Sequence, residues 1–343
     1  MREVAVVTTG FFDGVHLGHR HVLETVVSSA RERGEEAIVV SFWPHPRTVL
    51  QQDAREFRLL TSLDEKRELL LAAGADRVEV LPFTRQFAAL TAQEYLQLLR
   101  DRFQATLVVM GYDNRIGSDR QTAEQLCASA SASEGIVPQT VGCADPSHGK
   151  PWAPPSHVAE GGHRFGEQHP LLPCITVVDE YACHPERSRG ISAQQYISST
   201  QIRKALEAGD VERANGMLGY AYGLYGVVVA GNRLGRSIGF PTANMQLYEP
   251  LKLVPCNGVY AVEVEVIGAT YRGMCNIGTR PTVGGTTRTI ETHILDFDQD
   301  IYGLPMRIRF VCRIRDERKF PSLEALREQL QQDAVACRAL GTL

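Results

Sequence analysis

The sequence predicts a chain in two parts, an α/β domain on a mostly parallel sheet and a small antiparallel β-barrel with a C-terminal helix. Two observations support this prediction. Apolar β-branched runs alternate with helical patterns in the first part of the chain. Later the hydrophobic period changes to two, as in Val262, Val264 and Val266, which alternate with Glu263 and Glu265. Such alternation is typical of strands with one buried face.

The elements of the first part follow the order strand, helix, strand, helix. We expect strands at residues 4–9, 37–42, 77–81 and 107–110, and helices at residues 19–33, 62–73, 92–103 and 121–134. This order predicts parallel strands with helices on both faces, because each crossover returns the chain in the same direction. The layout is Rossmann-like, but the Gly-x-Gly-x-x-Gly motif of dinucleotide oxidoreductases is missing.

Proline and glycine then interrupt the pattern. Residues 145–190 are expected to form an irregular insertion, in which the apolar run 174–178 returns to the sheet as its next strand. The five histidines of this insertion are expected to be solvated, and the cysteine and histidine spacing fits no zinc-ligand pattern. We place the first domain at residues 1–200, with the insertion, and the second at residues 201–343.

Short helices lead from the first part into the barrel. We expect helices at residues 198–208 and 211–218, strands at residues 225–230, 259–267, 271–277, 289–297 and 306–315, and a last helix at residues 323–340. Ser322 is a suitable cap for the last helix, and the acidic Glu324 lies in its first turn.

The composition is that of a globular protein and excludes some partners. The net charge is −4 and the sequence pI is about 6.2, which gives no support to a nucleic-acid or membrane-surface role. The chain shows neither a signal peptide nor an apolar stretch long enough to span a bilayer, so we expect a cytoplasmic protein. The eight cysteines form no Cys-x-x-Cys pair and are expected to be reduced.

The most informative stretch runs from Gly10 to Arg20 and reads Gly-Phe-Phe-Asp-Gly-Val-His-Leu-Gly-His-Arg. It follows a predicted buried strand and enters a predicted helix. The carboxyl edge of an open α/β sheet is where ligands bind, and a helix N-terminus there favours anions. His16 and His19 therefore suit the stabilisation of negative charge on a phosphate in transfer. The alternative is a pair of capping or surface histidines.

A second segment, Ile197 to Arg203, reads Ile-Ser-Ser-Thr-Gln-Ile-Arg and opens another predicted helix. Ser198 and Gln201 have capping-box spacing. Arg203 lies in the first turns, where its planar guanidinium would suit a phosphate. The alternative is an ordinary capped helix with a solvated arginine.

A glycine-rich segment also precedes a short polar run in the second part. Gly231, Gly235 and Gly239 free backbone N–H groups to wrap phosphates. Thr242 and Asn244 then offer neutral oxygens, and a magnesium ion bound to nucleotide phosphates needs only one or two such ligands. The alternative is a hairpin loop with ordinary turn chemistry.

Glu291 lies in the run Thr-Ile-Glu-Thr-His of a predicted strand. A carboxylate beside a phosphoryl-transfer site can accept the proton of an attacking hydroxyl. The alternation alone favours the alternative, in which Glu291 is a solvent-facing strand residue. His293 should face the same side of the strand, and we assign it no role.

These motifs resemble a known family. His-x-Gly-His and Ile-Ser-Ser-Thr-x-Ile-Arg are similar to the signatures of the nucleotidyltransferase superfamily. The tetrad Pro-Thr-Ala-Asn beside Gly-Arg-x-x-Gly-Phe resembles the riboflavin kinase signature. Ser-Phe-Trp-Pro-His-Pro at residues 41–46, Leu-Thr-Ser-Leu-Asp-Glu-Lys at 60–66 and Val-Met-Gly-Tyr-Asp at 109–113 also match bacterial bifunctional riboflavin kinase/FAD synthetases. Only about residues 145–190 fall outside the resemblance.

The resemblance implies an enzyme that phosphorylates riboflavin to FMN and then transfers AMP from ATP to FMN, giving FAD and pyrophosphate. The implied partners are ATP, riboflavin, FMN and FAD, with Mg²⁺ as cofactor and a monomer or weak homo-oligomer as the assembly. The implied catalytic residues are His16, His19 and Glu291; the metal ligands are Thr242 and Asn244. The implied ATP- and phosphate-binding residues are Gly10, Asp13, Gly18, Ser199, Thr200, Arg203, Gly231, Gly235, Arg236 and Gly239, and the flavin-binding residues are Pro44, His45, Asp113 and Arg327.

Three residues depart from the family pattern. Many relatives carry asparagine where this chain has Phe11, and aromatic residues where it has Asn114 and Ile116. Three alternatives therefore stay open. They are a riboflavin kinase with a weakened adenylyltransferase domain, a non-catalytic flavin-binding regulator, and a first domain that transfers a nucleotide to another phosphorylated substrate.

Overall fold

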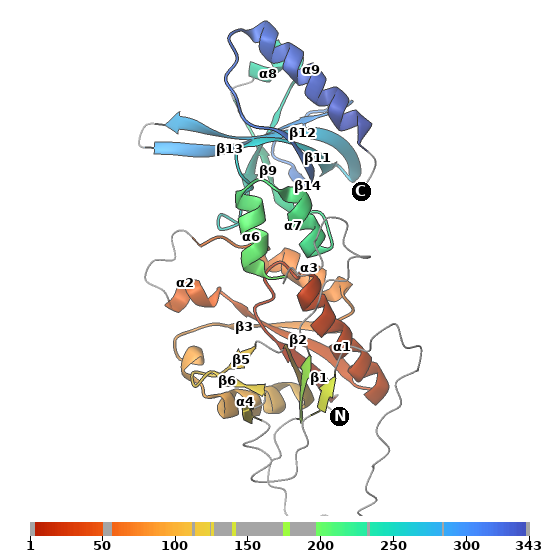
Figure 1. Ribbon diagram of the computed structural model, residues 1–343, viewed down its shortest axis with the longest axis vertical. Coiled ribbons are helices and arrows are strands. Elements are labelled where there is room, and N and C mark those ends of the chain that lie inside the picture. Colours follow the sequence, from red (N-terminus) through yellow and green to blue (C-terminus); the bar gives the residue numbers. More distant parts are fainter. Residues whose placement is uncertain are drawn as a thin grey trace, which may run out of the picture. The chain divides into compact units, whose positions relative to one another are not determined.

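The computed structural model describes residues 4–50, 57–111, 114–123, 125–126, 139–141, 174–178, 197–231, 234–282 and 285–340 (Figure 1). The chain divides into two compact units, which are described separately. The sheet unit comprises Met1–Phe12, Gly18–Arg55 and Arg67–Tyr181; the barrel unit comprises Asp13–Leu17, Glu56–Lys66 and Ala182–Leu343. Two short segments from early in the chain thus belong to the barrel unit. The division at residue 200 stays a prediction.

The sheet unit contains a parallel sheet, as predicted. Its order is β3 (Arg77–Pro82), β2 (Glu36–Trp43), β1 (Ala5–Thr9), β4 (Ala105–Gly111), β8 (Cys174–Val178) and β7 (Gln139–Val141). All neighbouring pairs are parallel. The predicted return of residues 174–178 to the sheet is confirmed, because β8 pairs with β4 from Leu107 to Gly111. Strand β7 was not predicted; its three residues all pair with β8.

Helices cover both faces of this sheet because alternate residues of β1 point to opposite sides. Ala5 and Val7 join a core with α4 (Ala92–Phe103), while Val6 joins a second core with α1 (Leu17–Arg33). All five residues of β1 are buried, as expected for a central parallel strand. The sheet edge from which α1 leaves is therefore held between two apolar layers.

The remaining elements of the sheet unit are short. They are α2 (Pro46–Leu50), the 3₁₀ turn η1 (Phe87–Ala89), β5 (Arg115–Ile116) and β6 (Gln121–Thr122). The predicted helix at residues 121–134 is wrong at its start, because Gln121 and Thr122 pair with β5 through a turn at Gly117 and Arg120, both with positive φ. Residues 127–134 lie outside the described residues. Helix α3 (Leu63–Ala72) follows its cap Ser62, whose Oγ accepts from Glu65 N at 3.2 Å.

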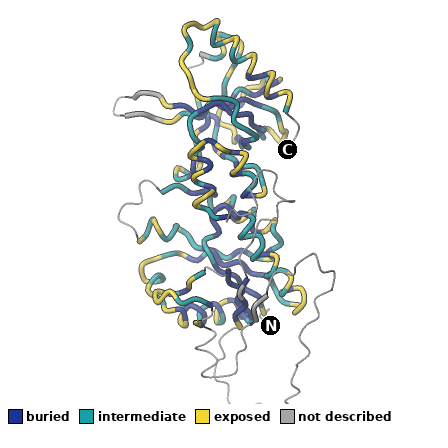
Figure 2. The backbone as a smooth tube through the Cα atoms, viewed as in Figure 1, coloured by how far each residue is buried: buried dark blue, intermediate teal, exposed yellow. Residues whose placement is uncertain are grey.

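The barrel unit is a closed antiparallel barrel, again as predicted. Its strand order is β10 (Ala243–Leu247), β13 (Gly285–Ile294), β12 (Ala269–Thr282), β11 (Gly258–Val266), β14 (Pro305–Arg315) and β9 (Gly223–Val229). Strand β10 was not among the predicted strands; its pattern is short, and pairing with β9 and β13 makes it a strand. Buried residues concentrate in the strands of both units (Figure 2).

Helices complete the barrel unit. They are α6 (Ser199–Glu207), α7 (Val211–Leu218), α8 (Leu234–Ser237) and α9 (Leu323–Ala339). Ser322 caps α9 by accepting from Ala325 N at 3.2 Å, as predicted. In the described part of the chain, no helix has the length and apolar character that a membrane span requires.

A buried ion pair attaches α9 to the barrel wall. Arg315 of β14 donates to Asp333 of α9 through Nε at 3.0 and 3.1 Å and through Nη2 at 2.8 Å. The Asp333 side chain is 1% exposed and that of Arg315 is 17% exposed. The pair thus holds α9 against strand β14 of the barrel.

Replacing Asp333 by alanine should destabilise the protein by ~3–5 kcal/mol, because it leaves the Arg315 guanidinium without its buried partner. Urea unfolding followed by tryptophan fluorescence and circular dichroism would measure the loss. The matched control is Asp296→Ala, which removes an exposed ion pair with Arg338 and should cost less than ~1 kcal/mol. Equal losses in the two variants would contradict the role of the buried pair.

Candidate functional site

The carboxylate of Asp13 is the centre of the polar cluster in the barrel unit. Asp13 is 3% exposed and accepts from Leu60 N at 3.0 and 3.1 Å and from Thr61 N at 3.1 Å. The Thr61 hydroxyl donates to Asp13 at 3.3 Å and accepts from Gly14 N at 3.2 Å. A buried carboxylate needs several donors to offset its lost hydration, and here the backbone of residues 60 and 61 supplies them.

Arg203 is the charged partner of Asp13. Its Nη2 donates to the Asp13 carboxylate, and its Nε donates to Arg58 O at 3.0 Å. The guanidinium also lies over the Phe57 ring, 5.2 Å from the centroid. Its other N–H groups have no acceptor among the described residues, and a guanidinium carries five. Arg203 is thus held in place with donors left for an anion.

The start of α6 is joined to the same turn. The Ser199 hydroxyl donates to Asp13 O at 2.9 Å. Ser198 caps the helix by accepting from Gln201 N at 3.4 Å, so the predicted cap is confirmed. Thr200 is exposed in the first turn. The two sequence segments 13–17 and 197–203, far apart in the chain, therefore meet in the barrel unit.

His16 lies in this cluster as a neutral imidazole. The side chain is buried, and desolvation together with the positive charge of Arg203 lowers the pKa of His16 to about 4. At neutral pH the ring can therefore donate one hydrogen bond without carrying a charge. A neutral hydrogen-bond donor suits a position beside the positively charged Arg203.

Lys66 is a site residue that sequence reasoning left without a role. Its side chain is 1% exposed, and burial lowers the pKa of Lys66 to about 8, while the negative charge of Asp13 opposes the decrease. The run Leu-Thr-Ser-Leu-Asp-Glu-Lys was noted as a match, yet nothing in its helical spacing places the ammonium near Asp13. Its burial depends on the tertiary contact of residues 57–66 with the turn.

His19 belongs to the sheet unit, in the first turns of α1. Its ring meets the Phe12 ring edge to face, with centroids 5.2 Å apart. A Cβ at Gly10 would lie 3.2 Å from the Phe12 ring, so the absence of a side chain there gives this ring its room. Gly18 lies at the second position of α1, where backbone N–H groups are not used by the helix.

A cavity of about 590 Å³ opens beside this turn in the sheet unit. Its wall is aromatic and formed by Phe11, Phe42, Phe83, Phe87 and Tyr95. The Phe42, Phe83 and Phe87 rings contact one another with centroids 5.4 to 5.9 Å apart. The volume and apolar lining suit a planar aromatic ligand. Sequence analysis missed most of this wall, because its rings come from separate elements.

Neither Pro44 nor His45, two of the predicted flavin-binding residues, lines this cavity, although His45 contacts the lining residue Phe11. The His45 ring is 3.9 Å from the Phe11 ring, centroid to centroid, and His45 Nδ1 accepts from Arg47 N at 3.0 Å. Pro44 is exposed, one position before His45. Asn114 lines the cavity and donates to Thr9 O at 3.5 Å. Asp113 lies outside the described residues.

The second candidate site is a cavity of about 290 Å³ in the barrel unit. Thr242 and Glu291 both line it, as do Asn276 and Arg315. Leu326 and Leu330 of α9 close one side. Arg327, predicted near the flavin, is exposed at the next position of the same helix.

Strand register brings the polar groups of this site together. Glu291 of β13 is opposite Asn244 of β10 on one side and opposite Asn276 of β12 on the other. Asn276 had no role in the sequence analysis, because only the pairing of β12 with β13 reveals it. The row Asn244–Glu291–Asn276 crosses three strands and places two amides beside the carboxylate.

Two glycines of the preceding segment allow the backbone to approach closely. A Cβ at Gly231 would lie 2.1 Å from Asn244 Nδ2, and a Cβ at Gly235 would lie 2.2 Å from Phe240 O. Gly239 has a φ of +85°, which favours glycine. The predicted binding of phosphate by the backbone N–H groups of these glycines stays a prediction. His293 Nδ1 lies 2.7 Å from Pro241 O, so this histidine is bound to the backbone of the same segment.

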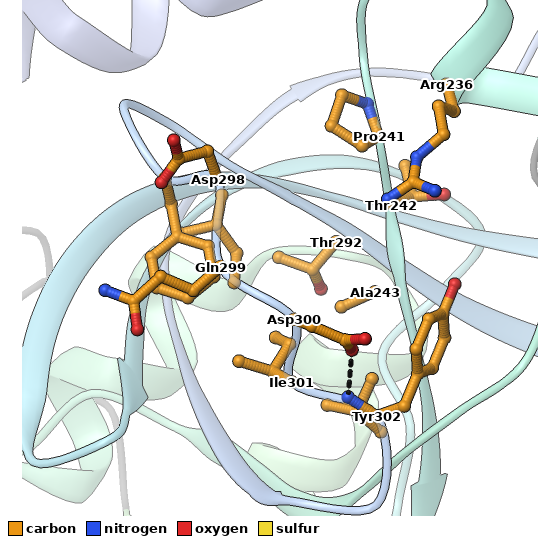
Figure 3. Close-up of a pocket in the computed structure, with 13 residues that line it drawn as sticks. Arg236, Pro241, Thr242, Ala243, Thr292, Asp298, Gln299, Asp300, Ile301 and Tyr302 are labelled. Atoms are coloured by element: carbon orange, nitrogen blue, oxygen red, sulfur yellow. Dashed lines mark hydrogen bonds between the residues drawn. The ribbon is translucent and has the colours of Figure 1, made fainter.

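A smaller cavity of about 90 Å³ lies at the Pro241–Ala243 run (Figure 3). Arg236 and Thr242 line it, as do Asp298 and Tyr302 of the loop that follows β13. Tyr302 N donates to Asp300 Oδ1 at 3.1 Å within that loop. Thr242 therefore faces both cavities of the barrel unit.

The fold and these groups define a class of protein. An arginine with spare donors and a neutral imidazole suit phosphate chemistry, and a carboxylate beside threonine and asparagine oxygens suits phosphoryl transfer to a hydroxyl. Such groups are characteristic of an enzyme that transfers a group from a nucleotide.

The comparisons with known proteins identify the family. The FAD synthetase family model matches residues 1–148, and the riboflavin kinase family model matches residues 218–340. The chain is 34% identical over 335 residues to the bifunctional riboflavin kinase/FMN adenylyltransferase of Listeria monocytogenes, covering 97% of this chain and 91% of that relative. It is 34% identical over 341 residues to the protein of the same name from Escherichia coli, covering 98% and 93%.

A solved structure agrees with this result. The crystal structure of a protein named macrolide-efflux protein from Streptococcus pneumoniae matches with a TM-score of 0.80 and 30% identity, covering 99% of this chain and 96% of that one. The chain therefore belongs to the family of bifunctional riboflavin kinase/FMN adenylyltransferases.

The pKa of His16 has a consequence for stability. Histidine has an ordinary pKa of 6.5, whereas that of folded His16 is about 4. Between these values the unfolded chain binds a proton at this position and the folded chain does not. The free energy of unfolding should therefore decrease as the pH falls from about 6.5 towards 4.

Replacing His16 by asparagine removes this contribution, so the variant should lose less stability than the wild type between about pH 7 and pH 5. Urea denaturation midpoints at several pH values would measure both slopes. Parallel slopes for the two proteins would contradict a buried, neutral His16. His21→Asn, at a position on α1 for which no such burial applies, is the control.

Proposed function

We propose that the chain converts riboflavin to FMN with ATP and then joins AMP from a second ATP to FMN, giving FAD and pyrophosphate. One observation carries this proposal. Within the barrel unit, Asp13 binds both Arg203 and Ser199, whereas Thr242 and Glu291 line a separate cavity. ATP, riboflavin, FMN and FAD are then the small-molecule partners. The cytoplasmic location, the absence of a nucleic-acid partner and the oligomeric state stay predictions.

Riboflavin phosphorylation is assigned to the barrel cavity. Glu291 is the proposed base that accepts the proton of the ribityl terminal hydroxyl as it attacks the γ-phosphate. Asn244 and Asn276 lie opposite it on the neighbouring strands. Gly231, Gly235 and Arg236 are the proposed phosphate-binding groups, since this segment approaches β10 closely.

Thr242 and Asn244 fit a magnesium ion by their chemistry. Both offer neutral oxygens from one short run, Thr242 just before β10 and Asn244 on it, and the space that a Cβ at Gly231 would fill is occupied by the Asn244 amide. A magnesium ion there would neutralise charge on the ATP phosphates. We propose these two side chains as its protein ligands, with phosphate and water completing the shell.

Adenylyl transfer is assigned to the groups around the glycine turn. Arg203 is the proposed donor to ATP phosphates, and Asp13 acts by holding Arg203 rather than by touching the phosphates, because its oxygens are occupied. The neutral His16 and the imidazole of His19 are proposed to stabilise the charge that develops on the α-phosphate. Ser199, Thr200, Gly10 and Gly18 are the proposed phosphate-binding groups of the same motifs.

The aromatic cavity of the sheet unit is the proposed FMN site. A flavin ring is planar and apolar on its faces, and the Phe11, Phe42 and Phe87 rings offer such contacts. Phe11 therefore supplies an aromatic contact in place of the amide of many relatives. This cavity favours adenylyl transfer to FMN over transfer to another phosphorylated substrate.

Glu291→Gln should remove most FMN formation from riboflavin, by ~10²–10⁴-fold, because the amide keeps the shape and loses the base. FAD formation from supplied FMN should continue at the wild-type rate. Chromatography of flavins after incubation with ATP and magnesium measures both rates. Near-normal FMN production would make Glu291 a structural strand residue.

His19→Ala should have the opposite selectivity. FAD formation from FMN should fall by ~10²–10³-fold, because a donor to the transition state is lost. FMN formation from riboflavin should persist. A thermal melt recorded beside the two assays separates loss of chemistry from loss of folding. If wild-type protein accumulates FMN and makes no FAD, the chain is a riboflavin kinase with an inactive first domain.

A further inference from the structure

Residues 57–66 are attached to the barrel part of the chain, although they follow the first strands of the sheet in sequence. Leu59 N donates to Leu251 O at 2.7 Å, and Leu253 N donates to Leu59 O at 2.8 Å, which forms a parallel bridge between Leu59 and Lys252. All of these residues belong to the barrel unit. The connection between β10 and β11 therefore holds this early segment by its backbone.

A buried ion pair strengthens the attachment. Lys252 Nζ lies 2.5 Å from Glu65 Oε2, with the two side chains 5% and 16% exposed. The ammonium also lies over the Tyr222 ring, 4.8 Å from its centroid. Tyr222 itself is fixed, because its hydroxyl donates to Leu253 O at 2.7 Å. Burial lowers the pKa of Lys252, while the negative charge of Glu65 opposes the decrease.

Glu65 connects this ion pair to the start of α3. Its Oε2 accepts from Ser62 N at 2.7 Å, and its own N–H donates to Ser62 Oγ at 3.2 Å. This reciprocal pair is a capping box. The same carboxylate oxygen thus binds Lys252 and fixes the backbone at Ser62, one residue after Thr61.

The next contacts reach the glycine turn. Leu60 N and Thr61 N are the backbone donors to Asp13, and Thr61 Oγ1 accepts from Gly14 N. Asp13 in turn holds Arg203. Tyr220, two residues before Tyr222, donates from its hydroxyl to Gly14 O at 2.8 Å. A Cβ at Gly14 would lie 2.9 Å from Leu60 Cδ1, so the turn and the segment are also in close apolar contact.

We propose that Lys252, a residue of the riboflavin kinase half, is a positioning residue for adenylyl transfer. Through Glu65 it fixes Ser62 and the Leu60–Thr61 backbone, which hold Asp13 and, with it, Arg203. This inference rests on the assignment of Arg203 to the adenylyl-transfer chemistry. It implies that the first family domain depends on the second for the geometry of its phosphate-binding groups.

The proposed kinase groups are placed differently. Thr242 precedes β10, Asn244 lies on β10 and Glu291 lies on β13. Lys252 lies beyond the end of β10 and is directed to Glu65 and Tyr222. Loss of its ammonium should therefore affect FAD formation selectively, even though the kinase cavity belongs to the same barrel unit.

The test is Lys252→Met in the full-length chain, a change that keeps the apolar stem and removes the charge. We expect kcat for FAD formation from FMN to fall by ~10- to 100-fold, since small displacements of binding groups have effects of this size. KM for FMN should stay within about twofold, because the aromatic cavity is unchanged. FMN formation from riboflavin should also stay within about twofold.

Three further variants make the result specific. Glu65→Gln keeps an acceptor for Ser62 N, loses the charge, and should show the same fall in kcat in a milder form. The double variant Lys252→Met/Glu65→Gln should be less impaired than the sum of the single changes, because neither partner is then left as an uncompensated charge. Lys204→Met, which removes an exposed lysine beside Arg203, should leave both activities unchanged.

Two outcomes would overturn the inference. One is a folded Lys252→Met or Glu65→Gln protein with wild-type kcat for FAD formation. The other is an equal fall of both activities in step with a lower melting temperature, which would make the pair purely structural. Wild-type protein that forms FMN and no FAD would overturn the proposed function first and this inference with it.

Discussion

The buried carboxylate of Asp13 is the interaction on which the rest of the first site depends. A carboxylate that is 3% exposed is stable only where donors surround it, and it receives them from Leu60 N, Thr61 N and Arg203. These donors come from the segment after β2 and from α6. The requirement to satisfy one charge therefore joins three stretches of chain that are distant in sequence, and it holds Arg203, whose remaining N–H groups have no acceptor among the described residues.

The polar site of the barrel is assembled in a different way. Its polar groups are brought together by strand pairing, which places Glu291 between two asparagines, and by glycines that let the backbone pass within contact of the Asn244 side chain. The α9 helix closes the cavity and is fixed by the buried Arg315–Asp333 pair. The two sites thus depend on separate contacts, which agrees with two separate reactions in one chain.

The local motifs were predictable because their signals are short-range. Glycines around His16, the cap at Ser198 and the Pro-Thr-Ala-Asn run are recognisable within ten residues each, and the alternation of β14 follows from its own side chains. Strand β10 was missed because five residues carry little periodicity, and pairing with β9 and β13 decides its conformation. The predicted helix at residues 121–134 began in a strand for the same reason: the β5–β6 turn overrides the local pattern.

The sequence by itself determined the order of elements, the parallel and antiparallel character of the two sheets, and the family, since these follow from hydrophobic period and motif. Only the tertiary structure decided which residues share a site. Asn276, Lys66 and Lys252 acquire their environment through strand register and burial, which depend on residues far away in the chain. A buried ammonium or carboxylate has no distinctive sequence pattern, because its cost and its compensation are set by neighbours that only folding brings together.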